Sequence, residues 1–289
     1  MTTVSVVTGG AGAMGAACAL TLAPTVDVVL LADLDVDRLA VIAERIGAAT
    51  TATVSTLAGD LSQPEVVDEL AARAQAFGRL ASLVHTAGVS PSMATWDDIL
   101  RVDLVATARL LDAFLPSVVP GSVAVCLASI AGHLGTFEPD MDDLLDRPGD
   151  ADLVPRFRAL VGDEPDPGLT YRLAKRGVIR LCERAAVTWG AHGGRVVSVS
   201  PGLIDTAMGR LELQNNPIKH WMAENTPVGG GRSGADTDSV LPGLADDIAD
   251  VVTFVCSGQA SFVSGCDIRV DGGLTAAMNA QTTSVGRPT

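Results

Sequence analysis

The chain has 289 residues, 47% of them apolar and 3% aromatic, so it can bury a large hydrophobic core and does not have the composition of a disordered protein. Its formal net charge is −14 at pH 7. Such an acidic chain repels phosphate backbones and anionic lipid, and we therefore expect neither a nucleic-acid partner nor a membrane partner.

The N-terminus and the cysteines are typical of a protein in a reducing compartment. No basic region precedes the first apolar residues, and the longest apolar runs, near 16–23 and 26–32, are shorter than the ~20 residues that span a bilayer. The five cysteines have no CxxC spacing, which favours buried free thiols. We expect a soluble cytoplasmic protein.

Apolar strands rich in valine alternate with helical patterns along the chain. The expected strands are Val4–Val7, Val28–Ala32, Thr53–Leu57, Leu83–His85, Val123–Ala128, Arg195–Val199 and Asp267–Val270. The expected helices are Gly15–Leu22, Val36–Ile46, Glu65–Phe77, Trp96–Leu115, Leu173–Trp189 and Ala245–Cys256. This alternation indicates a parallel sheet covered on both faces. We predict one α/β domain over residues 1–289, a doubly wound Rossmann fold that binds ligands at the carboxyl ends of its strands.

An acidic segment, residues 134–168, interrupts this alternation. Its part from Glu138 to Asp166 carries ten acidic residues and three arginines. Apolar residues recur there at helical spacing on both sides of Arg147-Pro148-Gly149, which predicts two short helices that form a lid or a subdomain. A disordered acidic loop is the alternative. The last residues, Ala276–Thr289, have the composition of a loose tail.

A glycine-rich turn follows the first strand. Gly10, Gly12 and Gly15 fit G-x-G-x-x-G, the pattern in which backbone N–H groups and a helix N-terminus hold a pyrophosphate. Asp33 ends the second strand, where a carboxylate accepts hydrogen bonds from ribose hydroxyls and repels a 2′-phosphate. No Arg or Lys lies in the glycine turn, and Leu34 follows Asp33. The pattern favours NAD(H) over NADP(H).

A tyrosine and a lysine lie four residues apart in one expected helix. Tyr171 and Lys175 would share a helix face, and a cation near a phenol lowers the pKa of that phenol toward the range of a general acid. Ser129 follows the strand Val123–Ala128, so its hydroxyl can hold a carbonyl oxygen. The alternatives are an exposed helix pair for the first two residues and a helix cap or turn for the serine.

Taken in order, these motifs resemble those of the short-chain dehydrogenases/reductases. The resemblance covers nearly the whole chain and extends to Asp60-Leu61, His85-Thr86-Ala87-Gly88, Pro201-Gly202-Leu203-Ile204-Asp205-Thr206 and the closing Val270-Asp271-Gly272-Gly273. It implies an acid–base set of Ser129, Tyr171, Lys175 and Asp103. It also implies cofactor contacts from Gly9, Gly12, Ala13, Met14, Gly15, Asp33, Leu34, Asp60, Leu61, Thr86, Ala87, Gly88, Tyr171, Lys175, Pro201, Gly202, Ile204 and Thr206.

The chain departs from the family pattern at several positions. Ala13 and the pair His85-Thr86 resemble the longer, epimerase-like members, whereas the Asp-Gly-Gly ending is that of the shorter members, and we expect the shorter class. Asp103 stands where the family has an asparagine that holds a proton-relay water. An aspartate keeps the acceptor oxygens but loses two donors.

The spacing between the serine and the tyrosine is a further departure. Ser129 and Tyr171 are 42 residues apart, because the acidic segment lies between them, as in bacterial 3α-hydroxysteroid dehydrogenases/carbonyl reductases of this family. That resemblance implies a homodimer, with a tetramer as the alternative. Residues 207–228 fall where the family has a mobile substrate loop, and their apolar side chains either shape a substrate pocket or pack against the body.

The expected activity is an NAD(H)-dependent interconversion of a secondary alcohol and a ketone, with a bulky apolar, steroid-like or cyclic substrate. Two alternatives stay open: an epimerase- or dehydratase-like reaction with retained NAD, and a non-catalytic dinucleotide sensor. The four histidines share no metal-ligand spacing, so no metal is expected. Of these, His133 lies close enough to Ser129 in sequence to face a substrate.

Overall fold

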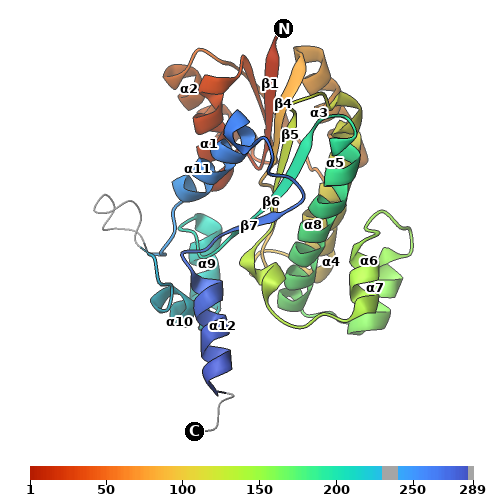
Figure 1. Cartoon of the computed structure of the whole chain (residues 1–289), viewed down its shortest axis with the longest axis vertical. Helices are drawn as coiled ribbons and strands as arrows, with labels where there is room; N and C mark the ends of the chain where they lie inside the picture. Colours follow the sequence, from red (N-terminus) through yellow and green to blue (C-terminus); the bar gives the residue numbers. More distant parts are fainter. Residues whose placement is uncertain (230–239, 286–289) are drawn as a thin grey trace.

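The computed structural model describes residues 1–229 and 240–285, the side chains of 281–285 excepted. A seven-stranded parallel sheet with the order β3-β2-β1-β4-β5-β6-β7 forms its centre (Figure 1). The strands are β1 Thr3–Thr8, β2 Val28–Asp33, β3 Thr53–Ala58, β4 Arg79–His85, β5 Val123–Leu127, β6 Arg195–Pro201 and β7 Asp267–Val270. The predicted doubly wound Rossmann fold is confirmed, and its strand order reverses between β1 and β4, where ligands bind in such sheets.

Helices cover both faces of the sheet. They are α1 Ala13–Leu22, α2 Val36–Ala49, α3 Pro64–Phe77, α4 Trp96–Ile99, α5 Ala106–Phe114, α6 Pro139–Leu145, α7 Leu153–Val161, α8 Pro167–Gly190, α9 Ala207–Asn215, α10 Ile218–Glu224, α11 Ala245–Cys256 and α12 Leu274–Val285. Helices α3, α5 and α8 pack on one face, and α1, α2 and α11 on the other. The apolar sequence of the central strands follows from this, because both of their faces are buried.

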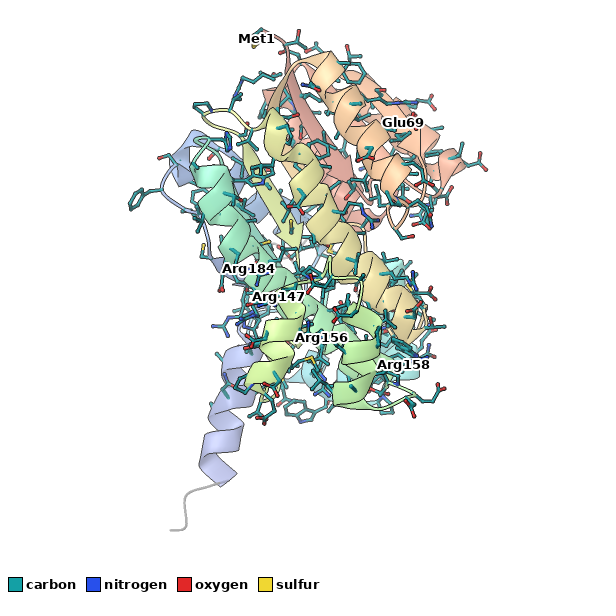
Figure 2. The ribbon with its side chains drawn as sticks, turned by 90° about the vertical axis from the view of Figure 1, so that its right-hand side faces the viewer. Met1, Glu69, Arg147, Arg156, Arg158 and Arg184 are labelled. Atoms are coloured by element: carbon teal, nitrogen blue, oxygen red, sulfur yellow. The ribbon has the colours of Figure 1, made fainter. Side chains whose placement is uncertain are left out.

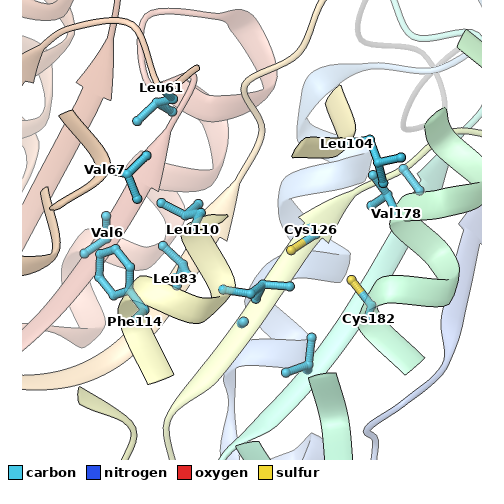
Figure 3. Close-up of a cluster of buried hydrophobic side chains, with 14 of the residues drawn as sticks. Val6, Leu61, Val67, Leu83, Leu104, Leu110, Phe114, Cys126, Val178 and Cys182 are labelled. Atoms are coloured by element: carbon cyan, nitrogen blue, oxygen red, sulfur yellow. The ribbon is translucent and has the colours of Figure 1, made fainter. Parts of the chain in front are cut away.

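Each strand supplies side chains to both cores in alternation. In β1, Val4 and Val6 contribute to the core under α3, α5 and α8, whereas Val7 contributes to the opposite core. Figure 3 shows part of the first core, with Val6 beside Phe114 of α5. All five cysteines are free; three are buried and two are half-buried.

The single helix expected over Trp96–Leu115 is interrupted. A π-helical turn, Leu100–Val105, separates α4 from α5, and Asp103 lies inside this turn. Such a turn inserts an extra residue into the helical repeat and changes the direction of the side chains that follow, and it is often found at functional sites. The apolar periodicity of the segment carries no mark of the inserted residue, which is why it predicts one continuous helix.

The acidic segment folds into α6 and α7, which pack along the outer side of α8. Asp142 of α6 and Asp146, which follows the end of that helix, form paired hydrogen bonds with Arg176 and Arg180 of α8 at 2.5–2.7 Å. Arg184 also contacts Asp146. Because both carboxylates and all three arginines are spaced by one helical turn, they form a ladder between the two helices. Figure 2 shows α6 and α7 against α8, with Arg184 near Arg147.

Helix α7 is fixed by aromatic contacts. The rings of Phe157 and Trp96 stack at a centroid distance of 6.1 Å, and the guanidinium of Arg158 lies 5.1 Å from the centre of the Trp96 ring. The segment is therefore held against α4 and α8 by both charge pairs and apolar packing. Among the described residues, none from 134–168 lines the groove at the carboxyl ends of the strands.

We expect Arg180→Ala to destabilise the protein by roughly 2 kcal/mol. The Arg180 guanidinium donates hydrogen bonds to both Asp142 and Asp146, and without it these two part-buried carboxylates would have fewer donors. Chemical unfolding measures the change. Arg147→Ala is the matched control, since Arg147 is exposed and lies outside the ladder. Equal stability of the two variants would contradict a structural role for the ladder.

The C-terminal region corrects one expectation. Residues 274–285, predicted from Ala276 onward as a loose tail, form α12, and residues 286–289 lie outside the described part of the chain. Helix α12 projects from the body, and its Leu274 packs with Ile130 and Met222. Within residues 1–229 and 240–285, no helix combines the length and the apolar character needed to cross a membrane.

Candidate active site

A groove of about 350 Å³ runs along the carboxyl ends of the central strands. Its walls come from the glycine turn, the end of β2, and the loops that follow β3, β4 and β6. Thirteen of the sequence-predicted cofactor residues line it: Gly9, Gly12, Ala13, Met14, Gly15, Asp33, Leu34, Asp60, Leu61, Thr86, Ala87, Gly88 and Thr206. The groove therefore lies at the switch point of the sheet, where a dinucleotide binds in this fold.

The two ends of the glycine turn lie too close together for a side chain at Gly15. A Cβ atom at Gly15 would lie 2.1 Å from the carbonyl oxygen of Gly9, so only glycine fits there. Helix α1 then begins after Gly12 with no side-chain cap, which leaves its first N–H groups free to bind a phosphate at the groove. These features fit the pyrophosphate of a nicotinamide dinucleotide.

Asp33 ends β2 and lines the groove. Its Oδ2 accepts a hydrogen bond from the N–H of Ala11 at 2.9 Å, and its Oδ1 accepts one from the N–H of Leu34 at 2.7 Å. Oδ1 also accepts the N–H of Asp35 at 3.3 Å, so three backbone donors fix the carboxylate, which keeps acceptor capacity for a ligand hydroxyl. Arg38 of α2 also lines this part of the groove, and the sequence analysis missed it because the direction of its side chain depends on how α2 is rotated.

Ser129, Tyr171 and Lys175 meet at the inner end of the groove. The Ser129 hydroxyl lies close enough to Tyr171 to lower the pKa of its phenol, and it accepts the N–H of Ala131 at 3.1 Å. Lys175 Nζ lies 5.5 Å from the centre of the Tyr171 ring and donates to the Leu127 carbonyl oxygen at 3.3 Å. A Cβ atom at Gly88 would lie 3.3 Å from Lys175 Nζ, so the lysine lies directly behind the groove wall.

Asp103 forms a buried ion pair with Lys175. Its Oδ2 lies 3.4 Å from Lys175 Nζ with no hydrogen-bond partner of good geometry, and its Oδ1 accepts the N–H of Val89 at 2.8 Å. Burial raises the pKa of Asp103, although Lys175 acts in the opposite direction. Burial alone would lower the pKa of Lys175, but Asp103 and Tyr171 outweigh it and the net pKa is raised.

The electrostatics at Tyr171 differ from the sequence expectation. Burial raises the pKa of this phenol, and Asp103 and Glu212 raise it further; Lys175 lowers it as expected but does not outweigh them. The phenol of the protein without ligand is therefore protonated over the whole neutral range.

We expect the phenol of Tyr171 to titrate above its ordinary value of about 10, and Asp103→Asn to lower that pKa, because the substitution removes a nearby negative charge. Tyr171 is the single tyrosine of the chain, so the ultraviolet absorbance of phenolate reports this residue alone. An unchanged titration curve in the variant would contradict the coupling between Asp103 and Tyr171.

His85 has a structural role below the groove. Its Nδ1 lies 2.7 Å from Thr8 Oγ1 and its Nε2 lies 2.9 Å from Thr107 Oγ1. Because Thr107 Oγ1 donates to the Asp103 carbonyl oxygen, it must accept from His85, which assigns the hydrogen to Nε2. Burial lowers the pKa of His85 to about 3. The histidine that pointed toward an epimerase is thus a neutral link between β1, β4 and the helical layer.

Several predicted residues lie outside the groove. Tyr171 and Lys175 flank its inner end without lining it. Pro201 and Gly202 end β6, where the Gly202 N–H donates to the Val270 carbonyl oxygen, and Ile204 lines a separate cavity of about 290 Å³. Residues that the sequence analysis did not assign also line the groove: Ala11, Asp35, Arg38, Gly59, Val89, Met93, Val102, Ala207 and Met208.

The remaining histidine near the site is held by a carboxylate. His133 Nε2 lies 2.8 Å from Asp267 Oδ2, so the ring is bound to the edge strand β7. Among the described residues, no group of three or more metal-ligating side chains is found.

The segment 207–228 both lines the groove and packs against the body. Met208 of α9 contributes to the groove wall, whereas Leu213 and Met222 are buried, the latter against Ile130 next to Ser129. Packing against the body is therefore confirmed for Leu213 and Met222, whereas a substrate pocket shaped by this segment stays a prediction.

Comparisons with known proteins show the family of the chain. Residues 3–138 match the family described as short chain dehydrogenase, and residues 159–275 match the one described as Enoyl-(Acyl carrier protein) reductase. The chain is 30% identical to cis-4-hydroxycyclohexanecarboxylate dehydrogenase of Sinomonas cyclohexanicum, over 94% of this chain and 96% of that protein.

A second relative and a solved structure extend the likeness. The chain is 28% identical to 3-alpha-hydroxysteroid dehydrogenase/carbonyl reductase of Comamonas testosteroni, over 68% of this chain and 73% of that protein. Its fold matches the crystal structure of levodione reductase with a TM-score of 0.74 at 23% identity, over 96% of this chain and 98% of that one. The chain is therefore a member of the short-chain dehydrogenase/reductase family of oxidoreductases.

Proposed function

We propose that this protein interconverts a secondary alcohol and a ketone with NAD(H) as the preferred cofactor. The observation that supports this most strongly is the convergence of Ser129, Tyr171 and Lys175 at the inner end of a groove whose far end carries Asp33. A nicotinamide dinucleotide, when bound, supplies or accepts the hydride at C4 of its nicotinamide ring.

The side chains of this chain handle the oxygen and its proton. In the reductive direction, the hydroxyls of Ser129 and Tyr171 donate hydrogen bonds to the carbonyl oxygen, and Tyr171 transfers its proton to that oxygen as the alcohol forms. Lys175 stabilises the phenolate left behind and would hold the nicotinamide ribose. The raised pKa of Tyr171 favours reduction at neutral pH, because this direction uses the protonated phenol.

Asp103 keeps Lys175 charged and in place. The ion pair at 3.4 Å opposes the loss of the lysine proton that burial would otherwise favour. We expect Asp103→Asn to leave the maximal rate unchanged or higher. Because the Asp103 carboxylate raises the pKa of Tyr171, the fall of the reduction rate at alkaline pH should begin at a lower pH in this variant. A large loss of rate would instead show that the Asp103 carboxylate itself is needed for turnover.

Apolar side chains around the site favour a bulky apolar substrate. Met93 and Met208 line the groove, and Ile130, next to Ser129, packs with Met222. The two relatives named above carry names of dehydrogenases for a ring-containing alcohol and a hydroxysteroid. We therefore propose cyclic or steroid-like alcohols and ketones as the substrate class.

Parallel titration with NADH and NADPH tests the cofactor proposal, with quenching of tryptophan fluorescence as the signal. We expect micromolar binding of NADH, about −8 kcal/mol, and at least tenfold weaker binding of NADPH. Asp33→Ser should reverse much of this preference, because it removes the carboxylate while Arg38 remains on the same wall. The preference for NAD(H) is wrong if the unaltered protein binds NADPH more tightly, and binding of neither would overturn the whole proposal.

The substrate class is tested with the same protein and the better cofactor. Turnover of cyclic and steroid ketones is compared with turnover of open-chain sugars by following NADH absorbance. We expect kcat/KM to be at least about tenfold higher for the apolar set, which corresponds to roughly 1.4 kcal/mol of extra transition-state binding. A preference for sugars would contradict the apolar site.

A further inference from the structure

A hydrogen bond joins two walls of the dinucleotide groove. The backbone N–H of Ser92, in the loop after β4, donates to Oε1 of Glu212 on α9 at 3.0 Å. The two residues are 120 positions apart in the sequence. Met93, next to the donor, lines one wall of the groove, and Met208, one helical turn before the acceptor, lines the other. The bond therefore links the loop that carries Met93 to the helix that carries Met208.

Helix α9 is fixed at its start and joined to the opposite wall at Glu212. At its first turn, Thr206 Oγ1 accepts the N–H of Gly209 at 3.0 Å, and the N–H of Asp205 donates to the Gly243 carbonyl oxygen at 2.7 Å. Glu212 lies farther along the helix, near its buried Leu213. The bond to Ser92 thus connects the distal half of α9 to a loop that does not belong to the same layer of the fold.

The Glu212 carboxylate also acts on charged groups near the reacting atoms. It is one of the groups that raise the pKa of Tyr171. It opposes the effect of burial on Lys219 of α10, whose pKa is lowered. Glu212 therefore has two effects: it binds the Ser92 N–H, and its charge raises the pKa of Tyr171. Substitutions at Glu212 can separate the hydrogen bond from the charge.

We propose that Glu212 is a positioning residue that holds α9 against the loop after β4 and so retains the dinucleotide and substrate in the groove during turnover. This inference rests on the proposed function for the identity of the ligand. A carboxylate that accepts from a backbone N–H forms a charge-assisted bond, which is stronger than a neutral one. The bond ties the loop that carries Met93 to the helix that carries Met208, and both methionines line the groove.

Two substitutions at Glu212 distinguish the bond from the charge. Glu212→Gln keeps an acceptor oxygen for Ser92 and removes the negative charge, whereas Glu212→Ala removes both. We expect Glu212→Ala to release NADH about tenfold faster and to raise the substrate KM by a similar factor, and Glu212→Gln to stay within about threefold of the unaltered protein. Both variants should lower the pKa of Tyr171, measured by phenolate absorbance.

Release is measured by stopped-flow displacement of bound NADH with excess NAD⁺. Glu224→Ala is the matched control, because Glu224 is an exposed glutamate at the end of α10. A purely structural effect would change stability in both Glu212 variants and would not separate Gln from Ala in release rate. Equal release from Glu212→Ala and the unaltered protein would overturn the inference.

A measurement without any dinucleotide separates this inference from the proposed function. Trypsin can cleave after Arg210 in α9 and Lys219 in α10, and cleavage requires local opening of these helices. We expect both sites to be cut several-fold faster in Glu212→Ala than in Glu212→Gln or Glu224→Ala. If the protein bound neither dinucleotide, the proposed function would fail while this comparison still decided the role of Glu212. Equal cleavage in all three variants would overturn that role.

Discussion

Tyr171→Phe should reduce kcat by about a thousandfold or more while NADH binding changes by less than about twofold. The substitution removes one oxygen atom, and with it both the hydrogen bond to the carbonyl oxygen and the proton that is transferred. The Tyr171 side chain is half-buried and lies next to Ser129. Steady-state turnover and fluorescence titration of NADH measure the two quantities on the same sample.

The fold of the variant needs its own control. Phenylalanine fills nearly the same volume, so the unfolding midpoint should stay close to that of the unaltered protein. Ser129→Ala provides a second comparison, because it removes the other hydroxyl and leaves the proton donor in place; we expect it to retain more activity than Tyr171→Phe. If Tyr171→Phe kept more than a tenth of the original kcat, the assignment of Tyr171 as the general acid would be wrong.

Lys175→Met is expected to remove most of the activity and to destabilise the protein by about 3 kcal/mol. The substitution leaves the buried carboxylate of Asp103 without the cation that lies 3.4 Å away, and removing one partner of a buried ion pair is costly. The phenol also loses the one nearby charge that lowers its pKa. Chemical unfolding and turnover measure the two losses separately.

A double variant separates the stability effect from the catalytic one. Asp103→Asn combined with Lys175→Met leaves no unpaired buried charge, so most of the lost stability should return while activity stays low. Asp103→Asn alone should keep the maximal rate, because Lys175 is still present. Recovery of activity in the double variant would show that Lys175 acts through the fold and not on the phenol.

The sequence predicted the fold and most of the groove well, for identifiable reasons. The buried parallel strands contain continuous valine-rich runs, and the glycines of the turn are required by a contact of atoms only a few residues apart, as Gly15 and Gly9 show. Asp33 follows from its place at the end of β2. Local patterns of this kind need no knowledge of tertiary contacts.

Features that depend on distant contacts could not be derived in the same way. The π-helical turn at Asp103 leaves the apolar periodicity unchanged, and the net pKa of Tyr171 depends on how deeply α8 is buried. Nothing in the sequence pairs Ser92 with Glu212. His85 was ambiguous for the same reason, since its partners Thr8 and Thr107 come from other elements.

The acidic segment was recognisable by composition, but the way it docks was not. Its aspartates are numerous, and only the three-dimensional arrangement shows that Asp142 and Asp146 face three arginines of α8. A solvated acidic face would have the same sequence pattern. The charge composition therefore identifies such a segment but does not show which residues it contacts.

Opposite faces of helix α8 carry the proposed catalytic residues and the arginines that bind the acidic segment. Tyr171 and Lys175 lie on one side, and Arg176, Arg180 and Arg184 lie about half a turn around the helix axis, where they hold α6. An exchange of the inserted segment that keeps two carboxylates one turn apart would leave the opposite side of the helix undisturbed. Evolved or engineered variants of this chain can therefore change the surface formed by residues 134–168 while Tyr171 and Lys175 stay in place.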